Sequence, residues 1–303
     1  MEQSNLVDLH VHSSASDGTL APAEVVCLAF DAGLRAIALT DHDTVSGIGE
    51  ALAEAECIRE EYRKRQNKET VFEVVPGIEI SCNYEGKELH ILGFYVDAEN
   101  EAFLEGLEEI RQKRIRRNEQ MAALCIEYGM DISMEELYHG NPGTVVTRAH
   151  FARVMQEKGY VKTKAEAFKK YISPGCPLYL PKPDIAPEHA MELLHMASAV
   201  PVLAHPLQYR MGDAQLERCI VFLKELGLKG IEAYHSSNNT YESGKLKNIA
   251  IRQGLLVTGG SDFHGDNKPD IRIGKGRGGL RVHESMLDAV RKQHAQLCSE
   301  SPI

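Results

Sequence analysis

Short apolar runs alternate with longer amphipathic stretches along most of this chain. Runs such as Ala36-Ile37-Ala38-Leu39-Thr40 are typical of buried strands, and the longer stretches between them predict helices. We expect strands near 5–12, 36–40, 71–81, 88–95, 200–204, 230–234 and 255–258. We expect helices near 22–33, 46–66, 187–198, 213–226, 239–253 and 284–297. Strands that alternate with helices in this way predict an α/β fold with a parallel sheet at its centre.

The pattern changes near residue 97, after which strands are absent for about 75 residues by the same periodicity criteria. The expected helices there lie near 101–128, 133–139, 147–158 and 163–171. Repeated prolines between Pro174 and Pro187 then interrupt the chain before the α/β pattern resumes. We therefore predict that residues 1–97 and 185–303 form one barrel domain and that residues 98–184 form a helical insertion, or cap.

Residues that can bind metal recur where the predicted strands end. His10 and His12 point to the same face of the first strand, about 7 Å apart, because strand side chains alternate. The complete set has six imidazoles and three carboxylates: His10, His12, Asp17, His42, Glu79, His90, His205, Asp262 and His264. If the strands form a barrel, all of these side chains meet at one mouth, where barrel enzymes carry their chemistry.

These residues are too many for one ion, because a catalytic zinc uses about three protein ligands. Nitrogen and oxygen ligands without sulfur suit Mn²⁺, Fe²⁺ or Zn²⁺ alike. Such ions make hydroxide available near neutral pH and hold phosphoryl oxygens, which phosphate ester hydrolysis requires. Taken singly, His90 is more typical of a core histidine than of a metal ligand, and Asp262 alone could cap a helix. Their joint recurrence at strand ends favours a metal site with two or three ions.

Composition excludes some partners. The formal net charge of −10 argues against a protein that coats duplex DNA. The chain has no apolar run of about 18 residues, so we expect no membrane partner. Its seven cysteines are scattered and its N-terminus does not resemble a signal peptide, which together predict a cytoplasmic protein with reduced thiols. The sequence indicates no obligate protein partner.

Five motifs together resemble the signature of the PHP (polymerase and histidinol phosphatase) domain family. They are Asp8-Leu9-His10-Val11-His12, Thr40-Asp41-His42-Asp43, Pro76-Gly77-Ile78-Glu79-Ile80-Ser81, Ala204-His205-Pro206 and Gly260-Ser261-Asp262-Phe263-His264. The resemblance covers most of the chain and implies a distorted (βα)7 TIM-like barrel with three divalent metal ions, of Mn, Fe or Zn.

The resemblance also implies how the metal ligands are shared. His10, His12, Glu79 and Asp262 would hold the first ion; Glu79, His90 and His205 the second; Asp17, His42 and His264 the third. All nine positions match the family pattern, so the resemblance implies an active site. On this view Glu79, Asp262 and His264 hold a metal-bound hydroxide that attacks phosphorus.

The insertion narrows the comparison within the family. Its segments 147–153 and 177–183 resemble the subgroup of nucleoside 3′,5′-bisphosphate phosphatases and a related 5′-to-3′ exonuclease that acts on short RNA. An insertion between the fourth and fifth strands would overhang the barrel mouth, where Arg148 could donate a forked pair of hydrogen bonds to a phosphate. Lys182 and His235 are further candidates for the same anion. The basic run 111–117 is either a solvated helix face or a guide for an RNA 5′ end.

We therefore predict a metal-dependent phosphoesterase that converts a nucleoside 3′,5′-bisphosphate to the 5′-monophosphate and phosphate. Its partner would be a small phosphorylated nucleotide or a short RNA end. Two other activities stay open, namely 5′-to-3′ exonuclease action on short RNA and a histidinol-phosphate-type phosphatase. A non-catalytic metal-binding regulatory module is the alternative from another class. Product analysis separates these, because only an exonuclease releases mononucleotides from an oligomer.

Overall fold

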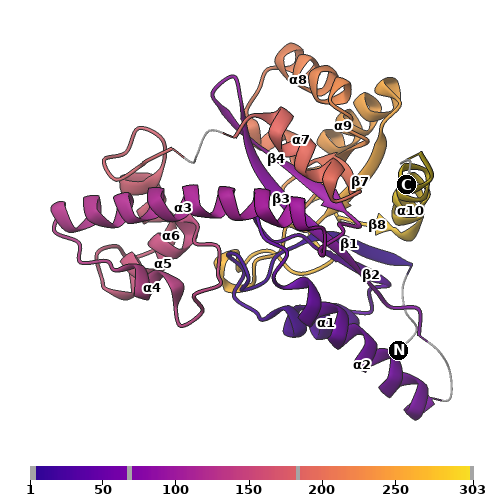
Figure 1. Ribbon diagram of the computed structural model, residues 1–303, viewed down its shortest axis with the longest axis horizontal. Coiled ribbons are helices and arrows are strands. Elements are labelled where there is room, and N and C mark those ends of the chain that lie inside the picture. The colour runs from indigo at the N-terminus through magenta and orange to yellow at the C-terminus, as the bar shows by residue number, and fades with distance from the viewer. Residues whose placement is uncertain (1–4, 67–69, 182–184, 301–303) are drawn as a thin grey trace.

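The computed structural model describes residues 5–66, 70–181 and 185–300 of the chain (Figure 1). Its strands form one sheet in the spatial order β7-β6-β5-β4-β3-β2-β1-β8. The strands are β1 (Leu6–Val11), β2 (Ala36–Leu39), β3 (Glu73–Tyr84), β4 (Lys87–Phe94), β5 (Val200–Leu203), β6 (Gly230–His235), β7 (Leu256–Gly260) and β8 (Val282–His283). Seven of these agree with the strands predicted from the sequence, and the two-residue β8 was not predicted.

The sheet closes on itself because the end of β7 lies beside β1. The backbone N–H of His12 donates to the carbonyl of Phe263 at 2.9 Å, and the N–H of Asp262 donates to the carbonyl of His10 at 2.9 Å. The short β8 pairs with the start of β1 in the antiparallel direction. The predicted TIM-like α/β barrel is therefore confirmed, and the β1–β7 contact brings two of the five motifs together.

Strand β4 departs from the expected parallel arrangement. It runs antiparallel to both β3 and β5, and a two-residue turn joins it to β3. Both turn residues, Glu85 and Gly86, have positive φ, as a tight hairpin requires. Because β4 runs the other way, its first half lies at the mouth, where His90 pairs with Ser81. The sequence pattern had suggested that His90 and Glu79 lie at strand ends. They lie instead within β4 and β3.

Most helices pack around the outside of the barrel. They are α1 (Pro22–Asp31), α2 (Ile48–Gln66), α7 (Pro187–Met196), α8 (Asp213–Glu225), α9 (Thr240–Gln253) and α10 (Glu284–Glu300), with short 3₁₀ turns η2 (Pro206–Tyr209) and η3 (Gly265–Asn267). Proline at the first position of α1 and α7 fixes where these helices begin. Their ends lie within three residues of the predicted ends.

The helices between β4 and α7 extend to one side of the barrel (Figure 1). They are α3 (Glu101–Glu127), α4 (Met134–Tyr138), α5 (Arg148–Glu157), α6 (Lys164–Ala167) and the π-helical turn η1 (Phe168–Ile172). The first turns of α3 pack on the barrel core through Phe103 and Leu107, whereas Met121 and Cys125 near its end belong to a separate buried cluster with α5. This second cluster supports the proposal that residues 98–184 form a helical insertion; we use that name below.

The insertion is attached to the loops at the barrel mouth. Thr144 Oγ1 donates to the carbonyl of Ser14 at 2.9 Å, and the N–H of Val145 donates to the carbonyl of Ala15 at 3.0 Å. On the other side Lys164 Nζ donates to Asn267 Oδ1 at 2.5 Å. These contacts place the beginning of α5 next to the loop that follows β1.

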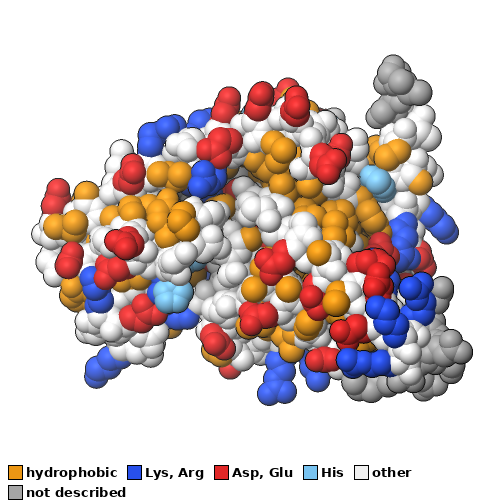
Figure 2. Space-filling view, turned by 60° about the horizontal axis from the view of Figure 1, so that its bottom comes forward, with side chains coloured by type: hydrophobic (Ala, Val, Ile, Leu, Met, Phe, Trp, Pro, Cys, Tyr) orange, Lys and Arg blue, Asp and Glu red, His pale blue; other side chains and the backbone are white. Residues whose placement is uncertain are grey.

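Acidic and basic side chains are interspersed over the face shown in Figure 2. This mixture is consistent with 44 acidic and 34 basic residues in the whole chain. Within the described part of the chain, no helix is both long enough and apolar enough to cross a membrane.

Candidate metal centre

The structure brings all nine predicted metal ligands together at the barrel mouth. Eight of them are buried and His90 is partly buried. Seven of them form three overlapping groups whose nitrogen and oxygen atoms are close enough to share a cation. The other two, His205 and Asp262, contact members of these groups. The side chains come from β1, β3, β4 and from the segments that follow β1, β2, β5 and β7.

Glu79 lies at the centre of these groups. Its Oε1 is 2.9 Å from His90 Nδ1 and 2.9 Å from His205 Nε2. Its Oε2 is 3.3 Å from His12 Nε2 and 3.0 Å from His42 Nδ1. Because its two oxygens face different groups of imidazoles, the Glu79 carboxylate can bridge two cations.

His10 and His12 form a second group with one edge of Asp262. The two Nε2 atoms are 3.1 Å apart, and Asp262 Oδ1 lies 3.7 Å and 3.5 Å from them. Two ring nitrogens this close face the same point, which is the arrangement expected of imidazoles that bind one metal ion. The alternation of β1 therefore places both histidines on one face, as the sequence pattern predicted.

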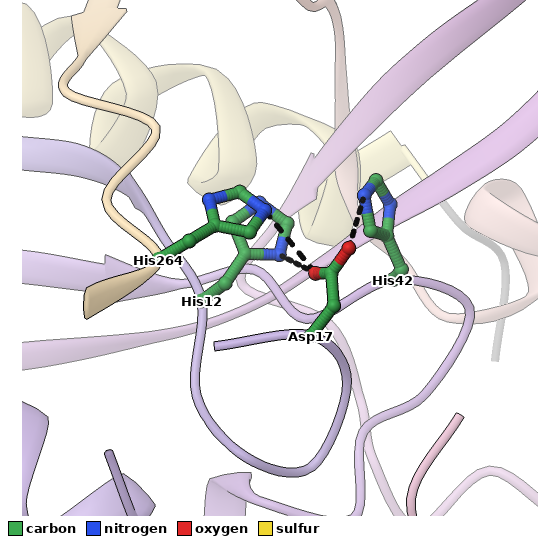
Figure 3. A group of neighbouring side chains, drawn as sticks. All are labelled: His12, Asp17, His42 and His264. Atoms are coloured by element: carbon green, nitrogen blue, oxygen red, sulfur yellow. Dashed lines mark ion pairs between the residues drawn. The ribbon is translucent and has the colours of Figure 1, made fainter. Parts of the chain in front are cut away.

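The third group surrounds Asp17 on the loop after β1 (Figure 3). Asp17 Oδ1 is 3.1 Å from His264 Nε2 and 3.8 Å from His12 Nδ1. Its Oδ2 is 4.0 Å from His42 Nε2. His12 thus takes part in two groups through its two ring nitrogens.

Several polar atoms in the cluster lack the hydrogen-bond partners that buried groups normally have. Asp17 Oδ1, Glu79 Oε2 and His42 Nδ1 are buried, and none of them forms a hydrogen bond of good geometry with the described residues. The imidazole nitrogens 3.0–3.1 Å from the two oxygens are close enough to share a cation with them but are not aligned as donors. Leaving such atoms unsatisfied is costly, and a cation among them would remove that cost. With a donor set of imidazole nitrogen and carboxylate oxygen, the residues fit divalent metal ions.

The electrostatics of the cluster favour charged carboxylates and, at His12 and His205, neutral imidazoles. His10 differs, because burial is outweighed by the carboxylates of Glu232 and Glu79, which raise its pKa. Burial alone would raise the pKa of Asp17, Glu79 and Asp262, but the surrounding imidazoles, together with Lys268 at Asp262, hold these pKa values well below the usual range. Burial lowers the pKa of His205 to about 4. A neutral imidazole has the free lone pair that metal binding requires.

Glu232 supports the cluster from below and was not identified from the sequence. Its Oε1 is 3.0 Å from His10 Nδ1, and its Oε2 accepts a hydrogen bond from the backbone N–H of His205 at 2.7 Å. A partner at Nδ1 leaves Nε2 of His10 directed toward the cation position. The available signal was a single charged residue inside the apolar strand 230–234, and it is completely buried.

Other aspartates of the motifs hold the loops and do not face the cluster. Asp8 accepts hydrogen bonds from the backbone N–H of Ser261 at 2.8 Å and from its hydroxyl at 2.5 Å. Asp41 accepts hydrogen bonds from the hydroxyls of Ser13 and Ser16, each at 2.6 Å. Asp8 therefore fixes the segment that carries Asp262, and Asp41 fixes the loop that carries Asp17.

Three non-glycine residues at the mouth have left-handed backbone conformations. The φ angles are 52° at Asp43, 26° at His205 and 57° at Asp262. Each such residue costs on the order of 1–3 kcal/mol and persists only where its surroundings impose it. The hydrogen bonds from the His205 and Asp262 amides impose this geometry, which turns both side chains into the cluster.

Arg148 lies at the edge of the cluster and does not contact its predicted metal ligands. Its Nη2 is 3.5 Å from Glu88 Oε2, and its guanidinium carbon lies 5.5 Å from the centre of the Tyr179 ring. Glu88 in turn contacts His90 Nε2 at 2.9 Å. Arg148 is therefore one residue away from the cluster, at the β4 side of the mouth.

The other predicted phosphate-binding residues have different positions. His235 is buried, with Nε2 3.3 Å from Asp262 Oδ2, so it lies next to the cluster. Lys182 lies outside the described residues. Lys268, which was not predicted, donates from Nζ to Asp262 Oδ2 at 2.5 Å. No periodic or motif signal distinguishes Lys268 in the loop after β7.

The basic run of α3 is only partly solvated. Arg114 is buried and pairs with Asp43, and Arg117 is buried and donates to the carbonyl of Leu180 at 2.7 Å. Burial, with Arg148 and Arg114 nearby, lowers the pKa of Arg117 to about 10. These two arginines hold the insertion to its surroundings, whereas Lys113 and Arg116 are exposed.

Comparisons with known proteins agree with this site. The sequence model of the PHP domain matches residues 8–164. A 3′,5′-nucleoside bisphosphate phosphatase of Chromobacterium violaceum is 34% identical over 272 residues, which cover 88% of this chain and 90% of that protein. A 5′-3′ exoribonuclease of Haemophilus influenzae is 33% identical over 261 residues, covering 85% and 89%.

A solved structure from Bifidobacterium adolescentis, assigned as a metal-dependent phosphoesterase, has a TM-score of 0.79 to this chain. The two sequences are 28% identical, and the alignment covers 98% of this chain and 97% of the other. The similarity therefore extends over the barrel and the helical insertion alike.

Proposed function

This chain belongs to the PHP domain family, and from that premise we propose that it is a metal-dependent phosphoesterase acting on a nucleotide. The preferred reaction is hydrolysis of a nucleoside 3′,5′-bisphosphate to the 5′-monophosphate and phosphate. The observation that carries this proposal is the convergence of six imidazoles and three carboxylates at one mouth, where buried oxygens of Asp17 and Glu79 form no hydrogen bond with the described residues.

We propose three divalent ions in this centre, of Mn, Fe or Zn. His10, His12, Glu79 and Asp262 would hold one, Glu79, His90 and His205 the second, and Asp17, His42 and His264 the third. Bound divalent ions supply hydroxide near neutral pH and offset negative charge on phosphoryl oxygens.

The protein's own residues determine which phosphate is placed at the centre. Arg148 stands beside Glu88 at the β4 side, where its guanidinium can donate two hydrogen bonds to a second phosphate. A nucleotide with its 5′-phosphate at Arg148 would present its 3′-phosphate to the metal centre. Glu232 holds the His10 ring in place throughout.

A substrate panel tests this function. Protein loaded with Mn²⁺ is incubated with adenosine 3′,5′-bisphosphate, adenosine 3′-monophosphate or histidinol phosphate, and free phosphate and nucleotide products are measured. We expect phosphate and AMP from the bisphosphate and little turnover of histidinol phosphate. Turnover of histidinol phosphate alone would contradict the assigned substrate while leaving the metal centre intact.

Arg148→Met provides the matched variant, because methionine keeps an unbranched apolar side chain and removes the charge. We expect KM for the bisphosphate to rise by roughly tenfold, about 1.4 kcal/mol, with a much smaller change for the 3′-monophosphate. An equal loss for both substrates would show that Arg148 does not bind the 5′-phosphate.

A further inference from the structure

A separate pocket opens beside the metal centre, between the turn that follows β6 and the loop that precedes β8. We call it the β6–β8 pocket. Its walls are the end of β6 with the turn after it, the first turns of α9, and the loop before β8; the lining residues are Tyr234, His235, Asn238, Asn239, Thr240, Ser243, Gly244, Lys247 and 277–281. His235 belongs to its wall, and His235 Nε2 lies 3.3 Å from Asp262 Oδ2. The wall of the pocket therefore adjoins the metal centre.

Glycines allow the loop before β8 to pack closely on the turn after β6. A Cβ atom on Gly276 would lie 2.4 Å from the Cα atom of Ser236. Gly278 has a φ of 68°, and a Cβ atom there would lie 3.0 Å from the carbonyl oxygen of Asn238. The N–H of Arg277 also donates to the carbonyl of Ser236 at 2.7 Å. The backbone beneath the basic side chains is thus held firmly against the pocket.

The side chains of this pocket carry positive charge that the protein does not neutralise. Lys247, Arg277 and Arg281 line it and are exposed, and none of them forms an ion pair with a carboxylate in the described part of the chain. On the same helix, by contrast, Lys245 pairs with Asp213 at 2.5 Å, and Arg252 also has an acidic partner. In a chain with a net charge of −10, unpaired cations gathered at one pocket indicate an anionic ligand.

The candidate metal ligands lie between Arg148 and the pocket. Arg148 contacts Glu88, and Glu88 contacts the candidate ligand His90. On the pocket side, His235 contacts the candidate ligand Asp262. If the 5′-phosphate of a nucleotide lies at Arg148 and its 3′-phosphate lies at the metal centre, any group attached beyond that phosphate points toward the β6–β8 pocket.

We propose that the β6–β8 pocket binds the backbone of a single-stranded RNA on the 3′ side of the bond that is hydrolysed. This proposal rests on the proposed function and extends it to oligonucleotides. The same P–O3′ bond breaks in both substrates. Water supplies the new oxygen on phosphorus, and a proton ends on O3′. The products are a nucleoside 5′-monophosphate and an RNA one nucleotide shorter that keeps the phosphate at its new 5′ end.

The Arg277→Gln/Arg281→Gln variant tests the pocket directly. KM is measured with Mn²⁺-loaded protein for a 5′-phosphorylated RNA octamer and for adenosine 3′,5′-bisphosphate. We expect KM for the octamer to rise roughly tenfold and its logarithmic dependence on salt to weaken by about 1.4, because two phosphate contacts to a single strand are lost. KM for the bisphosphate should change less than twofold, since a mononucleotide does not reach the pocket.

Lys113→Gln/Arg116→Gln is the matched control, because it removes the same charge from exposed positions of α3. An increase in octamer KM in this control, with none in the pocket variant, would overturn the proposal and place the RNA along the insertion. Fluorescence anisotropy of the labelled octamer with chelator-treated protein gives a second readout, and equal affinity of wild type and pocket variant would also overturn it. If wild type hydrolyses no nucleotide, the proposed function fails separately, since the binding measurement does not depend on turnover.

Discussion

Two regions of the barrel mouth contain buried carboxylates, and they treat those carboxylates differently. In the inner cluster, Asp17 and Glu79 each have a buried oxygen without a hydrogen-bond donor, and histidines surround them. In the outer ring, Asp8 and Asp41 accept hydrogen bonds from serine hydroxyls and backbone N–H groups on both oxygens. Asp8, Asp41 and Glu79 belong to the sequence motifs 8–12, 40–43 and 76–81. Asp17 lies in the loop that follows the first of these motifs.

The pKa shifts follow the same division. Burial raises the pKa of Asp8 and Asp41 even though their serine partners oppose the shift. Burial acts in the same direction on Asp17 and Glu79, but neighbouring imidazoles lower these pKa values well below the usual range. The outer acids are therefore parts of the scaffold, while the inner acids are arranged for a cation. Substitutions in the two regions should consequently fail in different ways.

The largest effect is expected for Asp262→Ala in the inner cluster. Loss of one carboxylate ligand should lower kcat/KM for the bisphosphate by roughly 1,000-fold, about 4 kcal/mol. Bound metal per chain, measured by elemental analysis, should fall while circular dichroism stays that of a folded protein. Asp266→Ala, an exposed aspartate of the same loop, is the control. Full activity with full metal content in Asp262→Ala would remove Asp262 from the site.

Asp41→Ala in the outer ring should act on stability. It leaves the hydroxyls of Ser13 and Ser16 and the N–H of Ser13 without an acceptor, which should lower the free energy of unfolding by about 3 kcal/mol. Urea unfolding measures this change, with the exposed Asp270→Ala as control. If Asp41→Ala lost bound metal and kept wild-type stability, Asp41 would belong to the metal site, and the distinction between inner cluster and outer ring would be wrong.

Glu232 holds the inner cluster from behind, through the His10 ring and the backbone N–H of His205. The Glu232→Gln variant should weaken metal binding without unfolding the barrel. An amide oxygen can accept from either the His10 ring or the His205 N–H, but the amide cannot accept from both on its two sides. We expect a 10- to 100-fold loss of metal affinity, the usual range for a group that holds a ligand from behind. Competition with a chelator measures it, and Glu225→Gln on the exposed surface serves as control. Unchanged affinity would assign Glu232 to folding alone.

The smallest effect is expected for Thr147→Val at the beginning of α5. Its hydroxyl donates to Asp17 Oδ2 at 3.0 Å, so the insertion helps to hold one inner acid. Loss of that hydrogen bond should reduce kcat/KM about fivefold, close to 1 kcal/mol, and most strongly at low metal concentration. Thr147→Ser should restore the activity. Equal losses in the valine and serine variants would point to packing of the methyl group.

The sequence predicted most of the fold because the helices and strands show clear periodicity and end at capping residues or prolines. The nine candidate ligands could also be found from the sequence, since metal-capable residues recur beside apolar runs. The direction of β4 could not be predicted from the sequence, because an alternating run such as 88–95 has the same pattern whether the strand is parallel or antiparallel to its neighbours. Glu232 and Lys268 were missed for a related reason: their partners, His10 and Asp262, are brought close only by the closed barrel.

We assign the inner cluster as a metal-dependent catalytic centre. One titration tests this assignment most directly. Protein is stripped with a chelator and then titrated with Mn²⁺, and bound metal and phosphate release from adenosine 3′,5′-bisphosphate are measured in the same samples. We expect the stripped protein to release no phosphate and the activity to return in step with metal occupancy. Equal phosphate release from stripped and loaded protein, or none from fully loaded protein, would contradict the assignment.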